Sequence, residues 1–123
     1  MKNVITWFEI PTNNFDRAVK FYSEILGEEV KVEDFMGQQL GFFAMDSMEG
    51  VGGNIMPPDQ NFKPSTNGAR VYFNCQGKLD QVLARVEKAG GKIIKPKINI
   101  GQPGWIALIS DSEGNIAGLH SAV

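Results

Sequence analysis

The sequence predicts an α+β protein built from two tandem β-α-β-β-β modules. Short segments of alternating polarity are interleaved with two amphipathic segments that each end at glycine, and both halves of the 123-residue chain have the same order of segments. A chain of this length with 42% hydrophobic residues can bury one ordinary core. We expect one domain over residues 1–123, with module one at about 1–57, a linker at about 58–68 and module two at about 69–123.

Module one opens with a predicted strand over residues 4–10, which is rich in β-branched and aromatic residues. Pro11 cannot donate to a sheet and ends the strand, and the polar residues after it can cap a helix. The predicted helix stops at Gly27 and has apolar residues at helical spacing, namely Phe15, Ala18, Val19, Tyr22, Ile25 and Leu26. Strands are predicted at 28–34, 38–46 and 51–57, and the glycines of the last one indicate a close backbone approach or a bulge.

Module two repeats this order beyond a polar, proline-containing connection at 57–68. A strand is predicted at 69–75, an amphipathic helix at 77–91, and strands at 92–100, 104–110 and 115–123. A shift of 64 residues superposes the two modules and keeps turns on turns. The equivalent positions are Phe15 and Leu79, Tyr22 and Val86, Gly50 and Gly114, Asn54 and Gly118, and, with a shift of 63, Trp7 and Arg70.

The composition excludes several classes of protein. The formal charge is −2, from 12 basic and 14 acidic residues spread along the whole chain. This distribution predicts no concentration of positive charge that would bind nucleic acid or an anionic membrane. The single cysteine, Cys75, allows no internal disulfide, and one Cys with one His rules out the usual zinc motifs. No apolar run suits a secretory signal or a membrane span of roughly 20 residues. We therefore expect a cytoplasmic protein without a nucleic-acid or membrane partner.

The repeated order resembles the vicinal oxygen chelate superfamily, which includes glyoxalase I, extradiol dioxygenases, fosfomycin-resistance enzymes and bleomycin-resistance proteins. Three segments carry the resemblance, and they are similar to the superfamily's first helix, second helix and final turn and strand: "FDRAVKFYSEILG" (15–27), "LDQVLARVEKAGGKI" (79–93) and "SDSEGNIAGL" (110–119). The resemblance implies two modules whose mixed sheets curl around a shared cavity, commonly completed by formation of a homodimer.

In metal-dependent members of the superfamily, the first and the last strand of each module each provide one metal ligand. By the resemblance, these positions are Trp7 and Asn54 in module one, and Arg70 and Gly118 in module two. Tryptophan and glycine offer no coordinating side chain, arginine repels a divalent cation, and a lone asparagine binds one too weakly. We therefore expect no metal at the usual site and no other cofactor.

Glu9 and His120 lie two residues beyond Trp7 and Gly118 on the same strand faces, and the sequence leaves their roles open. One alternative is a displaced metal site with Glu9 and His120 as its ligands, although two protein ligands seldom suffice. Glu9 is also a candidate general base, provided that burial makes its carboxylate basic enough, or the partner of Arg70 in a structural ion pair. Arg70 is equally suited to bind a ligand's carboxylate or phosphate in a forked arrangement.

The strand alternation also predicts which residues of module two face the cavity. Val71, Phe73 and Cys75 are expected to pack on the helix, which makes Cys75 a buried hydrophobic residue. Trp7, Tyr72 and Trp105 offer aromatic surface to a flat or partly apolar ligand, although core packing also explains Trp7 and Trp105. The predicted ligand-binding residues are Trp7, Glu9, Asn54, Arg70, Tyr72, Asn74 and His120, with Glu9 as the candidate catalytic residue.

From these residues we predict metal-free binding of a small organic molecule in the cavity. One alternative is a lyase or isomerase of the glyoxalase type, or a dioxygenase-like enzyme, that uses an atypical metal site or Glu9 as a base. A second alternative is a dimeric interaction unit that has a filled cavity and no ligand.

Overall fold

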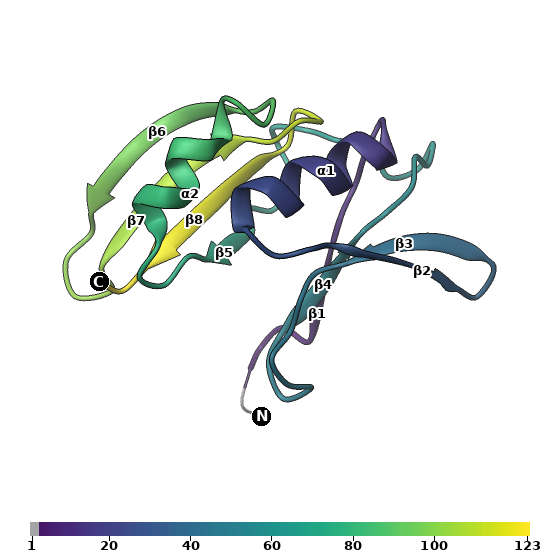
Figure 1. Cartoon of the computed structure of the whole chain (residues 1–123), viewed down its shortest axis with the longest axis horizontal. Coiled ribbons are helices and arrows are strands. Elements are labelled where there is room, and N and C mark those ends of the chain that lie inside the picture. The colour runs from purple at the N-terminus through teal and green to yellow at the C-terminus, as the bar shows by residue number, and fades with distance from the viewer. Residues whose placement is uncertain (1–2) are drawn as a thin grey trace.

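The computed structural model describes residues 3–123, so the predicted start of module one at residue 1 lies outside the described part. Two four-stranded sheets and two helices follow one another in the order β-α-β-β-β, twice over. The predicted α+β class with two modules of this order is therefore confirmed. The two helices lie side by side (Figure 1), and α2 contacts the sheet of module two while α1 contacts β4 of module one.

Module one forms a mixed sheet in the order β1-β4-β3-β2. β1 is parallel to β4, whereas β3 is antiparallel to both of its neighbours. The strands are β1 (Trp7–Ile10), β2 (Lys31–Phe35), β3 (Gln38–Phe42) and β4 (Gly52–Ile55). β1 is shorter than the predicted strand over residues 4–10, because β4 begins opposite Trp7 and offers no backbone partner to the residues before it.

Module two forms a second mixed sheet with the equivalent order, β5-β8-β7-β6, in which β5 is parallel to β8. The strands are β5 (Tyr72–Asn74), β6 (Lys92–Asn99), β7 (Trp105–Ser110) and β8 (Ile116–Ser121). β6 lies at the edge of the sheet, and its pairing with β7 shifts register on both sides of Lys95, with Pro96 inside the second shift. An edge strand tolerates proline there, because proline has no N–H to donate to a second neighbour.

The helix α1 (Phe15–Leu26) has the predicted bounds and stop signals. Asn14 precedes it in an extended conformation, and Asn14 Oδ1 accepts a hydrogen bond from Arg17 N at 3.0 Å, which caps the first turn. At the other end Gly27 adopts φ of 71°, a left-handed conformation that glycine reaches without strain, and its N–H donates to Ser23 O.

The helix α2 (Leu79–Val86) is shorter than the predicted segment 77–91. Lys78 stands at its N-cap and makes no side-chain capping hydrogen bond, in contrast to Asn14 at the start of α1. Beyond Val86 the chain continues in turns that end in a hydrogen bond from Gly91 N to Val86 O. The apolar periodicity extended the prediction past the last regular helical turn.

The core joins the two modules through a cluster of aromatic rings. Tyr22 of α1 contacts Phe43 from module one at 5.5 Å between ring centroids and Phe73 of β5 at 5.2 Å. Phe8 of β1 contacts the same two phenylalanines at 5.5 and 5.8 Å. Because these rings come from both modules, packing of the shared core fixes the sheets relative to each other.

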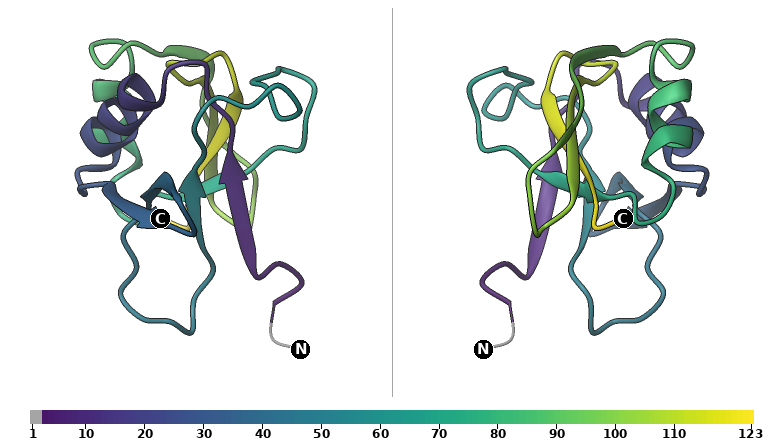
Figure 2. Two further views of the ribbon diagram at one scale, coloured as in Figure 1. Left: turned by 90° about the vertical axis from the view of Figure 1, so that its right-hand side faces the viewer. Right: turned by 90° about the vertical axis from the view of Figure 1, so that its left-hand side faces the viewer.

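Both helices cover one side of the sheets, and the connection at 57–68 extends on the opposite side (Figure 2). The sheet faces turned away from the helices leave large side chains exposed, including Trp7 and Tyr72. Along residues 3–123, no helix has both the length and the apolar character that crossing a membrane requires.

Candidate functional site

An open cavity of about 940 Å³ lies where the two modules meet. One wall is formed by β1, β4 and the loop that joins β3 to β4, and the other by β5 and the residues leading into it. The apolar part of the lining includes Phe8, Phe43 and Phe73 from the aromatic core. The cavity therefore continues the interface between the modules outward to solvent.

The structure separates the predicted ligand-binding residues into two groups. Four of them line the cavity, namely Trp7, Arg70, Tyr72 and Asn74. Glu9, Asn54 and His120 do not line it. The burial pattern of β5 agrees with the predicted alternation, because Phe73 and Cys75 are buried while Tyr72 and Asn74 are exposed. Val71 and Phe73, which were expected to pack on the helix, also line the cavity.

Trp7 is held against the last strand of its own module. Its Nε1–H donates to Asn54 Oδ1 at 2.7 Å, and Asn54 Nδ2 donates in turn to Met56 Sδ at 3.2 Å. Asn54 is 2% exposed, so its amide is fixed by these partners. The indole crosses Gly52, where a Cβ would lie 3.0 Å from Trp7 Cζ3. A Cβ on Gly52 would collide first with the thioether of Met45, so this glycine makes room for Met45 as well as for the Trp7 ring. Of the two predicted alternatives, a close approach or a bulge, the close approach is found at this glycine.

Tyr72 is an aromatic residue of the first strand of module two, at the position that corresponds to Glu9 of module one. It pairs in register with Gly118 across the parallel strands β5 and β8, and its ring lies over the glycine. A Cβ on Gly118 would collide with Cδ2 and Cε2 of Tyr72. Gly118 therefore provides space for an aromatic ring at a position where the resemblance places a metal ligand.

These four positions do not fit a divalent ion. Trp7 and Asn54 satisfy each other by their hydrogen bond, the Tyr72 ring covers Gly118, and Arg70 carries a positive charge. In the described part of the chain, moreover, no three His, Cys, Asp or Glu side chains gather into a group that could bind a metal ion. The metal chemistry that the resemblance implies therefore has no ligand set at these positions.

The predicted ion pair between Glu9 and Arg70 is not formed. Within residues 3–123 the ion pairs are Arg17 with Glu113 and Lys97 with Asp80. The prediction is wrong because Arg70 lines the cavity, whereas Glu9 is exposed on β1 away from it. His120 is in the other sheet, and its Nε2 lies 2.8 Å from Pro103 O. Neither Glu9 nor His120 reaches the cavity wall.

Three charged residues of the cavity were not predicted from the sequence, namely Glu28, Asp46 and Lys78. Lys78 Nζ donates to Leu26 O at the end of α1 at 3.3 Å, a favourable place for a cation because this carbonyl has no partner within the helix. Asp46 belongs to the loop between β3 and β4, and Glu28 follows the C-terminal turn of α1. These residues lie in loops or at helix ends, where no periodicity indicates which way a side chain points.

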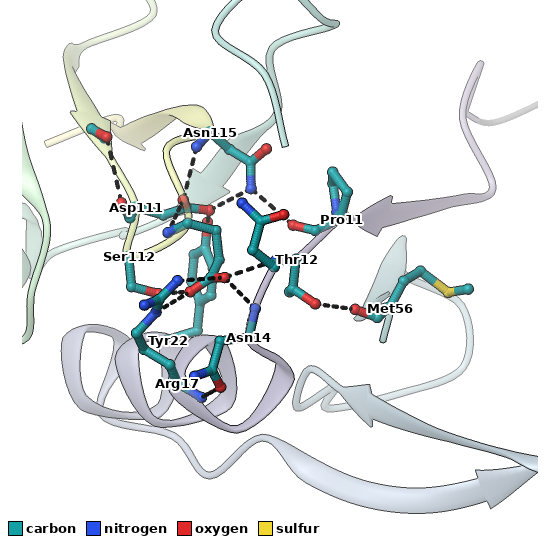
Figure 3. Close-up of polar contacts among 12 residues, drawn as sticks. Pro11, Thr12, Asn14, Arg17, Tyr22, Met56, Asp111, Ser112 and Asn115 are labelled. Atoms are coloured by element: carbon teal, nitrogen blue, oxygen red, sulfur yellow. Dashed lines mark hydrogen bonds and ion pairs between the residues drawn. The ribbon is translucent and has the colours of Figure 1, made fainter. Parts of the chain in front are cut away.

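A buried polar cluster near the site holds the start of α1 against module two (Figure 3). The carboxylate of Glu113 accepts hydrogen bonds from the backbone N–H groups of Asn13 and Asn14, from Arg17 and from Ser112. Burial alone would raise the pKa of Glu113, but the hydrogen bonds from Arg17, Asn14, Ser112 and Asn13 outweigh it and hold the pKa below its ordinary value.

The second half of this cluster is built on Asp111. Its Oδ2 accepts from the Tyr22 hydroxyl at 2.6 Å and from Asn115 Nδ2 at 2.9 Å, and Asn115 Nδ2 also reaches Pro11 O. Burial, reinforced by the charge of Asp111, raises the pKa of Tyr22 well above its usual range. Every polar group here has a partner within the protein, so the cluster fits a structural role in joining the modules.

Cys75 is fully buried behind β5, as predicted, and burial raises the pKa of its thiol. A thiol with a raised pKa is a poor nucleophile at neutral pH. The cavity, with its two aromatic rings and Arg70, is therefore the candidate functional site.

Solved structures with the same fold cover nearly the whole chain. A glyoxalase/bleomycin resistance protein from Albidiferax ferrireducens T118 matches with a TM-score of 0.75 and 19% identity, over 97% of this chain and 99% of that one. TnmS3, an antibiotic binding protein from Streptomyces sp. CB03234, matches with a TM-score of 0.73 and 18% identity, over 98% and 97%. The fosfomycin resistance protein FosX from Listeria monocytogenes matches with a TM-score of 0.67 and 17% identity, over 100% and 96%.

Sequence similarity leads to the same group. The chain is 30% identical over 113 residues to a protein named "Putative glyoxylase CFP32" from Mycobacterium tuberculosis, and the match covers 91% of this chain but only 41% of that protein. The model of the Glyoxalase/Bleomycin resistance protein/Dioxygenase superfamily matches residues 4–117. The chain therefore belongs to the glyoxalase/bleomycin resistance protein/dioxygenase superfamily.

Proposed function

We propose that this protein binds a small organic molecule, without a metal ion, in the cavity between its modules. The observation that carries the proposal is that aromatic rings occupy or cover positions where metal-dependent members of the superfamily have metal ligands. Trp7 is hydrogen-bonded to Asn54, and Tyr72 lies over Gly118. Both rings line the cavity, so side chains at or beside the expected ligand positions offer ligand-binding surface instead of coordination.

The size and chemistry of the cavity support binding. Its volume of about 940 Å³ falls within the range of small-molecule sites, and such sites combine apolar walls with a few polar groups. Here Arg70 and Asn74 provide polar groups beside the aromatic lining. TnmS3, which shares the fold, is described as an antibiotic binding protein, so this fold accommodates binding of an organic ligand elsewhere.

A second copy of the chain completes the site in this proposal. The cavity is open, and the large apolar side chains Phe35, Tyr72 and Ile98 are exposed on the sheets by 53%, 46% and 52%. A monomer that leaves such residues in water gains free energy when a partner covers them. The proposal also places the protein in the cytoplasm, which the free and buried Cys75 supports, because disulfides mark oxidising compartments.

Thermal unfolding in the presence of a small-molecule library and a chelator tests the proposal. A ligand at one hundred times its dissociation constant should stabilise the fold by about 2.7 kcal/mol. Gly50 lines the cavity, has free space around it and does not adopt a left-handed φ, so Gly50→Trp should fill the cavity without strain and abolish this stabilisation. Gly68→Trp is the matched control, because Gly68 also has free space but lies outside the cavity.

The outcome that contradicts the proposal is specific. A large rise in melting temperature on addition of nickel, zinc or iron, reversed by chelator, would favour a metal-dependent enzyme. Equal stabilisation of the Gly50→Trp and Gly68→Trp variants by the same ligand would place its binding outside the cavity.

An enzymatic role of the lyase or isomerase type is the second candidate, favoured by the similarity to a protein named as a glyoxylase. Glu9 remains its candidate base, although Glu9 is exposed and outside the cavity wall. If a turnover assay detects activity, Glu9→Gln should reduce kcat while leaving ligand binding unchanged. An unchanged kcat would remove Glu9 from the mechanism.

A further inference from the structure

The two modules each hold one aromatic ring of the cavity in a fixed position. In module one the Trp7 ring lies across Gly52 and donates its indole N–H to the buried Asn54 at 2.7 Å. In module two the Tyr72 ring lies across Gly118. Gly118 makes room for the Tyr72 ring alone, whereas Gly52 makes room for the thioether of Met45 and, at its side, for the Trp7 ring. These contacts, with the hydrogen bond of Trp7 to Asn54, restrict the rotamers that each ring can adopt.

Both rings remain open to a ligand even though they are held in place. Trp7 is 40% exposed and Tyr72 is 46% exposed, and both line the cavity. A ring that is already fixed loses little conformational entropy when a flat molecule stacks on it, so the gain from stacking is retained in the binding free energy. Exposed and preordered aromatic rings therefore favour a planar ligand over an aliphatic one of the same size.

Arg70 places a positive charge beside the Tyr72 ring. It lies two residues before Tyr72, just ahead of β5, and both residues line the cavity. Within residues 3–123 Arg70 forms no ion pair, whereas the other cation of the cavity, Lys78, donates to Leu26 O. The guanidinium is available to bind an anionic group in a forked arrangement.

The other polar residues of the cavity indicate how many negative charges a ligand should carry. Asn74 projects from the same face of β5 as Tyr72, and its Oδ1 accepts from Gln76 N, which leaves its side-chain NH₂ as a second donor beside the ring. Glu28 and Asp46 also line the cavity, and their carboxylates disfavour a second negative group on the ligand. One anionic group near Arg70 and Asn74 is favoured by this arrangement, because Lys78, the other cation of the cavity, is held against Leu26 O.

We propose that the ligand class of this cavity is a planar conjugated monoanion, whose ring system stacks on the aromatic walls and whose carboxylate or similar group binds Arg70. The inference rests on the proposed metal-free binding function and specifies the chemistry of its ligand. Trp7 and Tyr72 select for planarity, and Arg70 selects for the single negative charge.

Three probes of matched size separate these two preferences: 2-naphthoate, its neutral analogue 2-naphthamide, and the saturated decahydro-2-naphthoate. Isothermal titration calorimetry on the full chain measures each dissociation constant. We expect 2-naphthoate to bind about tenfold more tightly than 2-naphthamide, since a charge-assisted hydrogen bond is lost. It should bind about fivefold more tightly than the decahydro compound, since ring stacking is lost.

Variants assign each preference to its residue. Arg70→Gln should remove the preference for the anion and keep the preference for the flat ring, whereas Tyr72→Leu should do the opposite. The matched controls are Lys92→Gln and Phe35→Leu, which likewise remove one positive charge and one aromatic ring, but at exposed residues outside the cavity, and should leave both preferences unchanged.

Two outcomes would overturn the inference, and they differ in what they say about binding. If all three probes bind with equal affinity and Gly50→Trp abolishes their binding, the ligand class is wrong while the proposed function stands. If none of the probes binds, the ligand class is again wrong, and the chelator-resistant stabilisation by the wider library decides separately whether the binding function fails with it.

Discussion

The carboxylate of Glu113 in module two receives Nε–H and Nη2–H of Arg17 in module one, at 2.7 and 3.0 Å. The Glu113 side chain is fully buried, while that of Arg17 is half exposed. Backbone N–H groups just before α1 donate to the same carboxylate. Glu113 therefore replaces the missing hydrogen-bond partners at the start of a helix that belongs to the other module.

Replacing Glu113 by glutamine should lower the free energy of unfolding by about 2 kcal/mol, because the charge-assisted bonds from Arg17 and the backbone lose their strength. Urea unfolding at neutral pH measures this loss. The matched control is Glu49→Gln in the equivalent turn of module one, where Glu49 is exposed, and it should change the stability by no more than about 0.5 kcal/mol. Equal effects of the two variants would contradict the structural role of Glu113.

The same carboxylate should make stability depend on acid. Although burial opposes it, hydrogen bonding holds the pKa of Glu113 below its ordinary value of 4.5, so the folded state binds this proton less tightly than the unfolded state. The contribution of Glu113 is present above that ordinary value and is lost as the pH falls through the lowered pKa. The stability difference between wild type and Glu113→Gln should therefore shrink below pH 4.5. A difference that stays constant to pH 3 would be inconsistent with this assignment.

Tyr22 should produce the opposite dependence at high pH. Burial, together with Asp111, raises the pKa of Tyr22 well above its ordinary value of 10.0, so its contribution to stability is present below pH 10.0 and is lost as the pH rises further. Compared with Tyr22→Phe, the wild type should lose up to about 1.4 kcal/mol per pH unit above that point. The control Tyr72→Phe alters an exposed tyrosine and should keep the wild-type slope.

The fit of Tyr72 over Gly118 can be tested by a double-mutant cycle. Gly118→Ala should destabilise the protein by about 1–3 kcal/mol, because the added Cβ collides with the Tyr72 ring. In a Tyr72→Ala background the same change should cost much less, since the collision no longer exists. Additive effects of the two substitutions would show that the ring does not lie over the glycine in solution.

Much of the fold could be predicted, because the relevant information is local. Asn14 and Gly27 mark the two ends of α1 through capping geometry that depends on neighbouring residues only. Strand alternation correctly placed Tyr72 on the face opposite Phe73, and the repeat correctly paired the equivalent strands of the two modules. The alternation separates the exposed ring of Tyr72 from the buried ring of Phe73, but it does not predict which of them lines the cavity, because both do.

The partners of side chains from distant segments could not be predicted in the same way. Glu113 lies about one hundred residues from Asn13, and their contact depends on how the two modules pack. The predicted ion pair of Glu9 with Arg70 failed for the same reason, since the sequence gives each strand face but not the distance between strands of different sheets. Lys78 and Asp46 were missed because loops and helix ends have no periodicity.

The two acidic turns of the modules differ in how much of the fold depends on them. The turn at 111–114, Asp-Ser-Glu-Gly, joins the modules, whereas its relative at 46–50, Asp-Ser-Met-Glu-Gly, is largely exposed and lines the cavity with Asp46, Ser47 and Gly50. The chain thus contains two related turns, of which only the one at 111–114 connects the modules by hydrogen bonds. Substitutions in the exposed turn at 46–50 should therefore change the cavity wall, and with it the ligand preference, at little cost to the stability of the fold.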